Sequence, residues 1–163
     1  MIQHPDITLQ KASTKRAELK RRGETLVITN GCFDLLHSGH AYSLSQAAEM
    51  GNQLWVLMNS DSSVKKLKGE SRPIICERDR AYLLRSLRSV NEVIIFSSET
   101  IEEEIIELKP DIYVKSSDYN LDSMNQDERA ALEEVNAKIS FVEILPNLST
   151  TNILRQVLNK PEK

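Results

Sequence analysis

Two histidines are the residues of this sequence whose type and spacing most clearly suggest chemistry. His37 and His40 lie three positions apart, on either side of Gly39, in the stretch "NGCFDLLHSGH". The stretch follows a strand-like apolar run at 25–29, so both histidines should lie on one side of a beginning helix. A helix N-terminus presents free N–H groups to phosphate, and imidazole N–H groups can stabilise negative charge during phosphoryl transfer. The stretch therefore predicts a phosphate-binding site with two catalytic histidines.

Two other interpretations of the histidine pair stay open on spacing alone. The rings could be packing or surface residues, or they could bind a metal ion. The neighbouring residues favour the phosphate site. Gly31 permits close approach of a ligand or a positive φ, and Asp34 can accept hydrogen bonds from backbone amides at a tight turn. No third ligand has a spacing that suits a metal, so we predict no metal site built from protein ligands.

The rest of the chain supplies the elements that would position this stretch. Strand-like runs, several of them almost continuously apolar, occur at 25–29, 53–58, 92–96, 111–115 and 140–145. Helical patterns lie between them, at 39–50 with Gly51 as a C′ glycine, and at 77–90, 100–110 and 150–158. This alternation predicts an α/β fold, a Rossmann-like, doubly wound sheet of five parallel strands. Such sheets bind ligands at the carboxyl ends of their strands, where the histidine stretch would emerge.

Composition excludes several other classes of protein. The chain has 163 residues and a net charge of −3, which fits one domain and argues against nucleic-acid binding through a generally basic surface. No apolar run is long enough to span a bilayer, and the N-terminus has no signal-peptide pattern. The two cysteines form no disulfide framework, so the cytoplasm is the expected location.

Three more polar segments follow predicted strands or begin helices. Lys68 and Arg72, in "SVKKLKGESR", could neutralise phosphates, although such charge runs are often solvated surface loops. Arg80, in the first turn of the next helix, suits phosphate, or it could pair with Glu77. The run at 149–151 supplies hydroxyl groups at the start of the last helix, where they could also be an ordinary N-cap.

Together these segments resemble a known family. "NGCFDLLHSGH" is similar to the signature of the nucleotidyltransferases that share the HIGH-type motif with class I aminoacyl-tRNA synthetases. "NSDSSVKKLKGESRPI", "ERDRAYLL" and "STTNIL" match further motifs in the expected order, from about Thr25 to Leu158. Leu35 and Leu36 are typical of the cytidylyltransferase-like branch, and within it the motifs most resemble the stand-alone heptose 1-phosphate adenylyltransferases. We therefore expect an N-terminal helical extension over 1–24, a nucleotidyltransferase domain over 25–159 and a disordered tail over 160–163.

The resemblance implies a reaction and its ligands. The AMP moiety of ATP would pass to a sugar 1-phosphate, expected to be D-glycero-D-manno-heptose 1-phosphate, with release of pyrophosphate and formation of ADP-heptose for lipopolysaccharide. Mg²⁺ would bind mainly through the substrate phosphates. No nucleic acid or membrane partner is expected, and a homodimer is one option. Two alternatives stay open: a cytidylyltransferase acting on glycerol 3-phosphate or another phospho-alcohol, and a non-catalytic nucleotide-binding module.

The resemblance also assigns roles to residues. His37, His40 and Lys68 are expected to be catalytic, and Lys68 and Arg72 to bind the substrate phosphate. The expected nucleotide-binding residues are Asn30, Gly31, Cys32, Phe33, Asp34, Gly39, Asn59, Asp61, Arg80, Lys115, Ser116, Asp118, Ser149, Thr150 and Thr151. Ser116 and Ser117 stand where the family has glycines. If either position required a positive φ, serine would cost about 1 kcal/mol or more.

Overall fold

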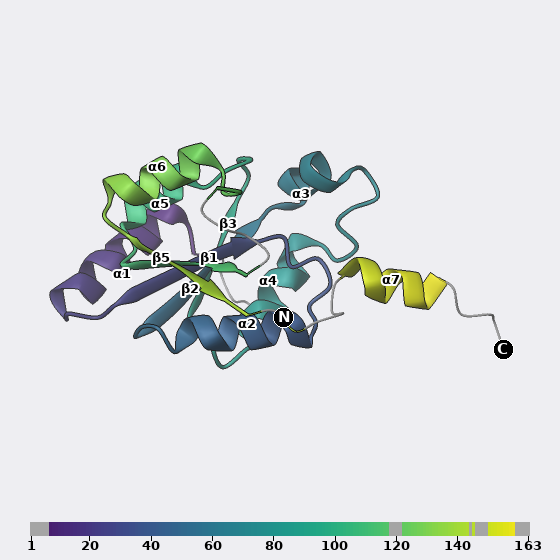
Figure 1. The fold of residues 1–163 in the computed structure, drawn as a ribbon, viewed down its shortest axis with the longest axis horizontal. Helices are drawn as coiled ribbons and strands as arrows, with labels where there is room; N and C mark the ends of the chain where they lie inside the picture. Colours follow the sequence, from purple (N-terminus) through teal and green to yellow (C-terminus); the bar gives the residue numbers. More distant parts are fainter. Residues whose placement is uncertain (1–6, 118–121, 144, 146–149, 159–163) are drawn as a thin grey trace.

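The central element of the fold is a sheet of parallel strands covered by helices on both faces (Figure 1). The computed structural model describes residues 7–117, 122–143, 145 and 150–158. The strands are β1 (Leu26–Gly31), β2 (Gln53–Asn59), β3 (Glu92–Phe96), β4 (Ile112–Ser116) and β5 (Lys138–Val142). Their order is β3-β2-β1-β4-β5, and every neighbouring pair is parallel. The predicted five-stranded, doubly wound α/β sheet is confirmed.

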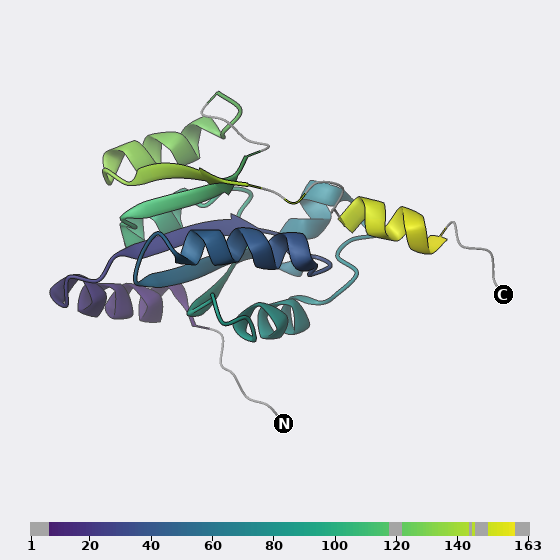
Figure 2. The ribbon, with the colours of Figure 1, turned by 60° about the horizontal axis from the view of Figure 1, so that its bottom comes forward.

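Seven helices occur in the part of the chain that the structure describes. They are α1 (Leu9–Arg21), α2 (Ser38–Ala48), α3 (Asp61–Lys68), α4 (Glu77–Arg85), α5 (Glu102–Leu108), α6 (Gln126–Glu134) and α7 (Thr150–Leu158). One face of the sheet packs against α1, α5 and α6, and the other packs against α2 and α4. Helix α7 extends away from the sheet in both ribbon views (Figures 1 and 2). None of the described helices is long and apolar enough to cross a membrane.

Successive residues of a strand point to opposite faces of the sheet. Both faces are buried because helices cover each of them. In β1, Leu26 and Ile28 face the α1 side and Val27 faces the α2 side, and all three are fully buried. Trp55 of β2 is also fully buried on the α1 side. Helix α1 lies within the predicted N-terminal extension and contributes Ala12 to the same core. The predicted tail at 160–163 lies outside the described residues.

Several predicted element boundaries differ from the structure, among them the helix expected at 77–90, which ends at Arg85. Two further differences have a clear physical reason. Strand β5 was expected at 140–145, but it runs from Lys138 to Val142, in register with Ile112 to Ser116 of β4. The partner strand therefore sets where β5 begins and ends. The prediction of Gly51 as a C′ glycine is wrong, because α2 already ends at Ala48 with Glu49 as its C-cap. Gly51 instead permits close packing, since a Cβ there would lie 2.6 Å from Val27 Cγ2.

Candidate active site

A cavity of about 880 Å³ opens at the carboxyl ends of the strands. Its walls come from the ends of β1, β2, β4 and β5, one side of α2, the first turns of α6 and α7, and the end of α3. Strands β1 and β4 are neighbours although β2 and β3 lie between them in sequence, so the chain reverses its winding direction here. Open α/β sheets bind ligands at this switch point.

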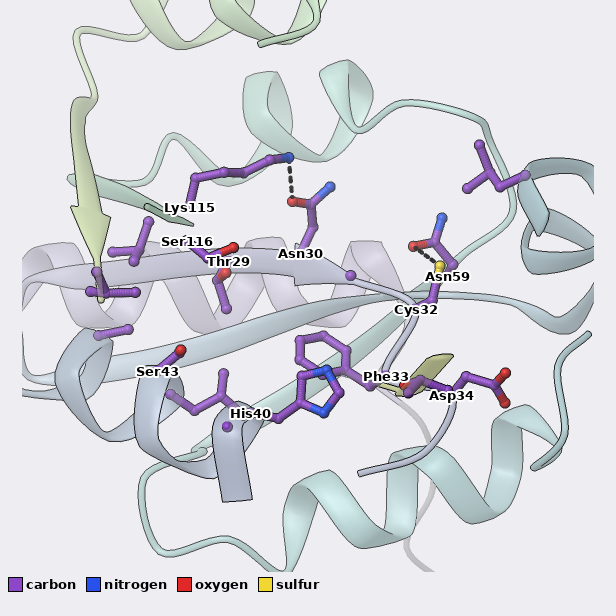
Figure 3. Close-up of a pocket in the computed structure, with 18 of the residues that line it drawn as sticks. Thr29, Asn30, Cys32, Phe33, Asp34, His40, Ser43, Asn59, Lys115 and Ser116 are labelled. Carbon is purple, nitrogen blue, oxygen red and sulfur yellow. Dashed lines mark hydrogen bonds between the residues drawn. The ribbon is translucent and has the colours of Figure 1, made fainter. Parts of the chain in front are cut away.

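Most of the predicted site residues meet in this cavity. Its lining includes Asn30, Gly31, Cys32, Phe33, Asp34, His37, Gly39, His40, Asn59, Lys68, Lys115, Ser116, Thr150 and Thr151 (Figure 3). Asp61, Arg72 and Arg80 do not line it. Asp118 and Ser149 lie outside the described residues. The roles assigned to all of these residues in ligand binding stay predictions.

The two histidines form a stacked pair at the start of α2. Their ring centroids lie 3.8 Å apart with an interplanar angle of 23°. His37 is the N-cap residue of α2, so the rings lie beside the free N–H groups of the helix start. The Nδ1 atoms of both rings are buried without a hydrogen-bond partner among the described residues. A ligand that reaches this end of the cavity meets imidazole rings and backbone amides together.

Burial favours the neutral form of both histidines. It lowers the pKa of His40 to about 4, with further contributions from His37 and the positive charge of Lys68. Burial also lowers the pKa of His37. A neutral imidazole carries one N–H, so each ring can donate one hydrogen bond to a phosphate oxygen. Lys68 supplies the formal positive charge beside them.

Phe33 and Gly31 support His40 from one side. The Phe33 ring meets the His40 ring edge-on, with centroids 5.2 Å apart. Phe33 has a φ of 48°, a left-handed conformation that is uncommon for a non-glycine residue. Gly31 does not have a positive φ, but a Cβ at this position would lie 3.1 Å from the Phe33 ring. Gly31 therefore leaves room for the ring that packs against His40.

Asp34 holds a neighbouring loop in place. Its carboxylate is buried and accepts hydrogen bonds from Arg72 Nη1 at 2.6 Å and from the backbone amides of Ile74 and Ile75 at 2.6 and 3.3 Å. Burial by itself would raise the pKa of Asp34, but these hydrogen bonds outweigh it and the pKa is lowered. Asp34 was expected to accept amides at its own tight turn, but the amides it accepts belong to a distant segment. These contacts join the loop at 32–37, called the histidine loop below, to the loop that precedes α4. Arg72, expected at the substrate phosphate, is the ionic partner of Asp34 in this structure.

Arg80 is buried beneath the site and does not line the cavity. The residue is 1% exposed, and its side chain donates to the carbonyl oxygens of Ile75, Cys32 and Asn59 at 2.9, 2.6 and 2.9 Å. It also donates to Asp61 Oδ1 at 2.7 Å. The alternative pairing with Glu77 is absent, and the Glu77 carboxylate instead accepts the Asp61 amide at 2.7 Å. Arg80 thus ties the carboxyl ends of β1 and β2 to α4 from behind the cavity.

The β4 end of the cavity contains a buried polar network that the sequence did not reveal in full. Lys115 Nζ donates to Asn30 Oδ1 at 3.0 Å and lies 3.5 Å from Glu128 Oε2. Glu128 is on α6, a helix missed in the sequence although Asn125 is a recognisable N-cap, accepting the amides of Asp127 and Glu128. Further lining residues to which the sequence assigned no role include Glu99, Thr100, Ser123 and Met124.

The serines that replace family glycines fit without backbone strain. Neither Ser116 nor Ser117 has a positive φ. Ser116 ends β4 and lines the cavity, and the Ser117 amide donates to Val142 O at 2.8 Å. The cost that a left-handed serine would carry therefore does not arise.

Comparison with known proteins identifies the family. The family model described as cytidylyltransferase-like matches residues 28–156. The chain belongs to the cytidylyltransferase-like family. Its match begins inside β1 and ends inside α7, so it includes the histidine stretch and the whole described cavity.

Several relatives share the name bifunctional protein HldE. The protein of Syntrophotalea carbinolica is 40% identical over 144 residues, covering 88% of this chain and 29% of the relative. That of Aliarcobacter butzleri is 42% identical over 151 residues, covering 92% and 30%. That of Helicobacter pylori is 52% identical over 101 residues, covering 62% and 22%. The chain thus spans less than a third of the length of these relatives.

A solved structure supports the same fold. The lipopolysaccharide core biosynthesis protein from Thermoplasma volcanium superposes with a TM-score of 0.61 at 27% identity. The match covers 76% of this chain and 98% of that protein.

Proposed function

We propose that this chain is an adenylyltransferase that transfers AMP from ATP to D-glycero-D-manno-heptose 1-phosphate, releasing pyrophosphate and forming ADP-heptose. The observation that carries the proposal is the stacked pair of His37 and His40 at a helix start, in the same cavity as Lys68. Family membership supports nucleotidyl transfer. The heptose assignment rests on the sequence motifs, and the HldE relatives and the lipopolysaccharide protein are consistent with it.

In the proposed reaction, a phosphate oxygen of the sugar phosphate attacks the α-phosphorus of ATP. The new P–O bond forms as the bond to the β-phosphate breaks, and pyrophosphate leaves with the electron pair. The attacking phosphate is already an anion near pH 7, so no general base is needed. The chain would position the two anions and stabilise the charge on the phosphate oxygens through His37, His40, Lys68 and the amides of α2.

Mg²⁺ is part of this proposal as an ion that arrives with the triphosphate. The described residues contain no group of three acidic, histidine or cysteine side chains placed to hold a metal ion. The phosphate oxygens and water would then be its main ligands, and the ion would supply further neutralisation of charge.

The decisive experiment measures pyrophosphate release for ATP and CTP, each paired with heptose 1-phosphate, glycerol 3-phosphate and a second sugar 1-phosphate. We expect ATP with heptose 1-phosphate to give the highest kcat/KM, and ATP to exceed CTP. The H37A variant, tested with the same pairs, is the control for a contaminating activity. Higher efficiency with CTP and glycerol 3-phosphate would favour the cytidylyltransferase alternative, and no release with any pair would favour a non-catalytic binding module.

A further inference from the structure

We propose that Glu128, Lys115 and Tyr113 are positioning residues that fix the Asn30 amide, so that Asn30 donates to a hydroxyl oxygen of a bound substrate. The hydroxyl belongs either to the ribose of the triphosphate or to the sugar phosphate. This inference rests on the proposed function, which supplies both substrates. It assigns Asn30 a recognition role distinct from the phosphate chemistry of the histidines.

The orientation of the Asn30 amide follows from its two hydrogen-bond donors. Tyr113 Oη donates to Asn30 Oδ1 at 2.9 Å, and Lys115 Nζ donates to the same oxygen at 3.0 Å. Lys115 Nζ also donates to Tyr113 Oη at 2.8 Å, which leaves the phenol proton for Asn30. A lysine ammonium has no acceptor, so the amide atom that faces it must be the oxygen. The opposite orientation would place an NH2 group against an ammonium group.

This orientation leaves the Asn30 NH2 group available to a ligand. Asn30 lines the cavity, and its Nδ2 atom has no hydrogen-bond partner among the described residues. In Figure 3 the amide oxygen faces Lys115 and the amide nitrogen lies on the other side of the side chain. Asn30 is on β1 and Lys115 on β4, so the donor group lies at the switch point of the sheet.

The charge around Asn30 favours a hydroxyl group over a phosphate. The side chains of Lys115 and Glu128 are 14% and 6% exposed, and their charged atoms lie 3.5 Å apart. The lysine charge is therefore balanced by a carboxylate that would repel a phosphate placed beside it. The charge of Lys68 acts on His40, at the phosphate end of the cavity. At the end of the cavity beside β4, the neutral amide donor of Asn30 therefore suits an uncharged hydroxyl group.

The first test replaces the donor while keeping the acceptor. N30D retains an oxygen for Lys115 and Tyr113 but removes both N–H groups. We expect the KM of one substrate to rise about threefold to tenfold, as for loss of one hydrogen bond, with kcat changed less than twofold. If the ribose is recognised, the KM of ATP rises and the preference for ATP over its 2′-deoxy or 3′-deoxy analogue shrinks. If the sugar is recognised, only the KM of the sugar phosphate rises.

The second test separates positioning from direct binding by Lys115. In E128Q, a less firmly held Asn30 should raise the KM of the same substrate as in N30D. If Lys115 binds phosphate directly, removing the competing carboxylate should lower that KM, which would overturn the proposal. Y113F, which keeps the buried ring, gives the same readout if E128Q does not fold. E134Q removes a charge from an exposed position on the same helix and is the matched control.

Calorimetric binding of a non-hydrolysable ATP analogue and of the sugar phosphate distinguishes failure of this inference from failure of the proposed reaction. A wild-type chain that binds either ligand more tightly than N30D supports the inference even if no pyrophosphate is released. Unchanged affinities and KM values for both ligands in folded N30D would overturn it.

Discussion

At the residue scale, the stacked histidines are the clearest target for mutation. We expect H37A and H40A each to lower kcat about 100-fold, because each removes one N–H donor aimed at charge on phosphate oxygens. Steady-state pyrophosphate release measures the effect, and thermal denaturation checks the fold. Y42F, at an exposed position on the same helix, should keep its activity. Wild-type turnover in either alanine variant would remove that histidine from the mechanism.

Sequence patterns predicted well which residues lie together at the site. They predicted less well which groups each of these residues contacts. The spacing of His37 and His40 predicted two rings on one side of a helix start, and the structure stacks them. Arg72 and Arg80 were expected at phosphates, but here they contact Asp34 and backbone carbonyls. A sequence shows the length and charge of an arginine side chain. Which group that side chain contacts depends on which side of its segment faces the protein interior.

At the element scale, Arg80 joins three segments that would otherwise have buried, unpaired carbonyl groups. We expect R80K to lower the free energy of unfolding by about 2 to 3 kcal/mol, because a lysine cannot reproduce the forked hydrogen bonds. Urea denaturation measures this loss. The matched control is R78K, at an exposed position on the same helix, which should change stability little. Equal stability of R80K and wild type would show that the connection by Arg80 is dispensable.

Helices and strands whose bounds follow from their own residues were predicted well. Those whose bounds depend on a packing or pairing partner were predicted less well. The apolar runs located β2 and β3 closely because burial on both faces leaves a continuous pattern. The bounds of β5 were displaced because its pairing with β4, not its own composition, sets the register. Helix α6 was missed because its apolar face is short, with only Ala131 and Leu132 as buried apolar residues.

At the scale of the whole molecule, burial of His40 makes stability depend on pH. The pKa of His40 is about 4 in the folded chain against an ordinary value of 6.5, so the unfolded chain binds more protons between these values. Stability from this group is therefore complete above pH 6.5 and decreases as the pH falls toward 4. Melting temperatures measured from pH 7.5 to 4.5 should fall, and H40Q should show a shallower fall. Parallel curves for the two proteins would contradict this assignment.

The overall topology followed from the alternation of strands and helices, but the strand order did not. A right-handed crossover between parallel strands constrains each step, yet the sequence does not state where the winding reverses. The structure places the reversal between β1 and β4, and so brings Asn30 and Lys115 together although most of the domain separates them in sequence. The polar network at that point was therefore beyond local pattern analysis.

The hydrogen bonds from the Ile74 and Ile75 amides to Asp34 should slow the hydrogen exchange of these amides. Ile74 is 48% exposed and lies in a segment between helices, which would ordinarily suggest fast exchange of its amide. Yet both amides donate to a buried carboxylate that Arg72 also holds, so they exchange only when the histidine loop and this segment separate. We expect both amides to exchange at rates close to those of β1, measured by NMR, and D34N to accelerate them. The exchange of two loop amides would then report on how firmly the histidine loop is held.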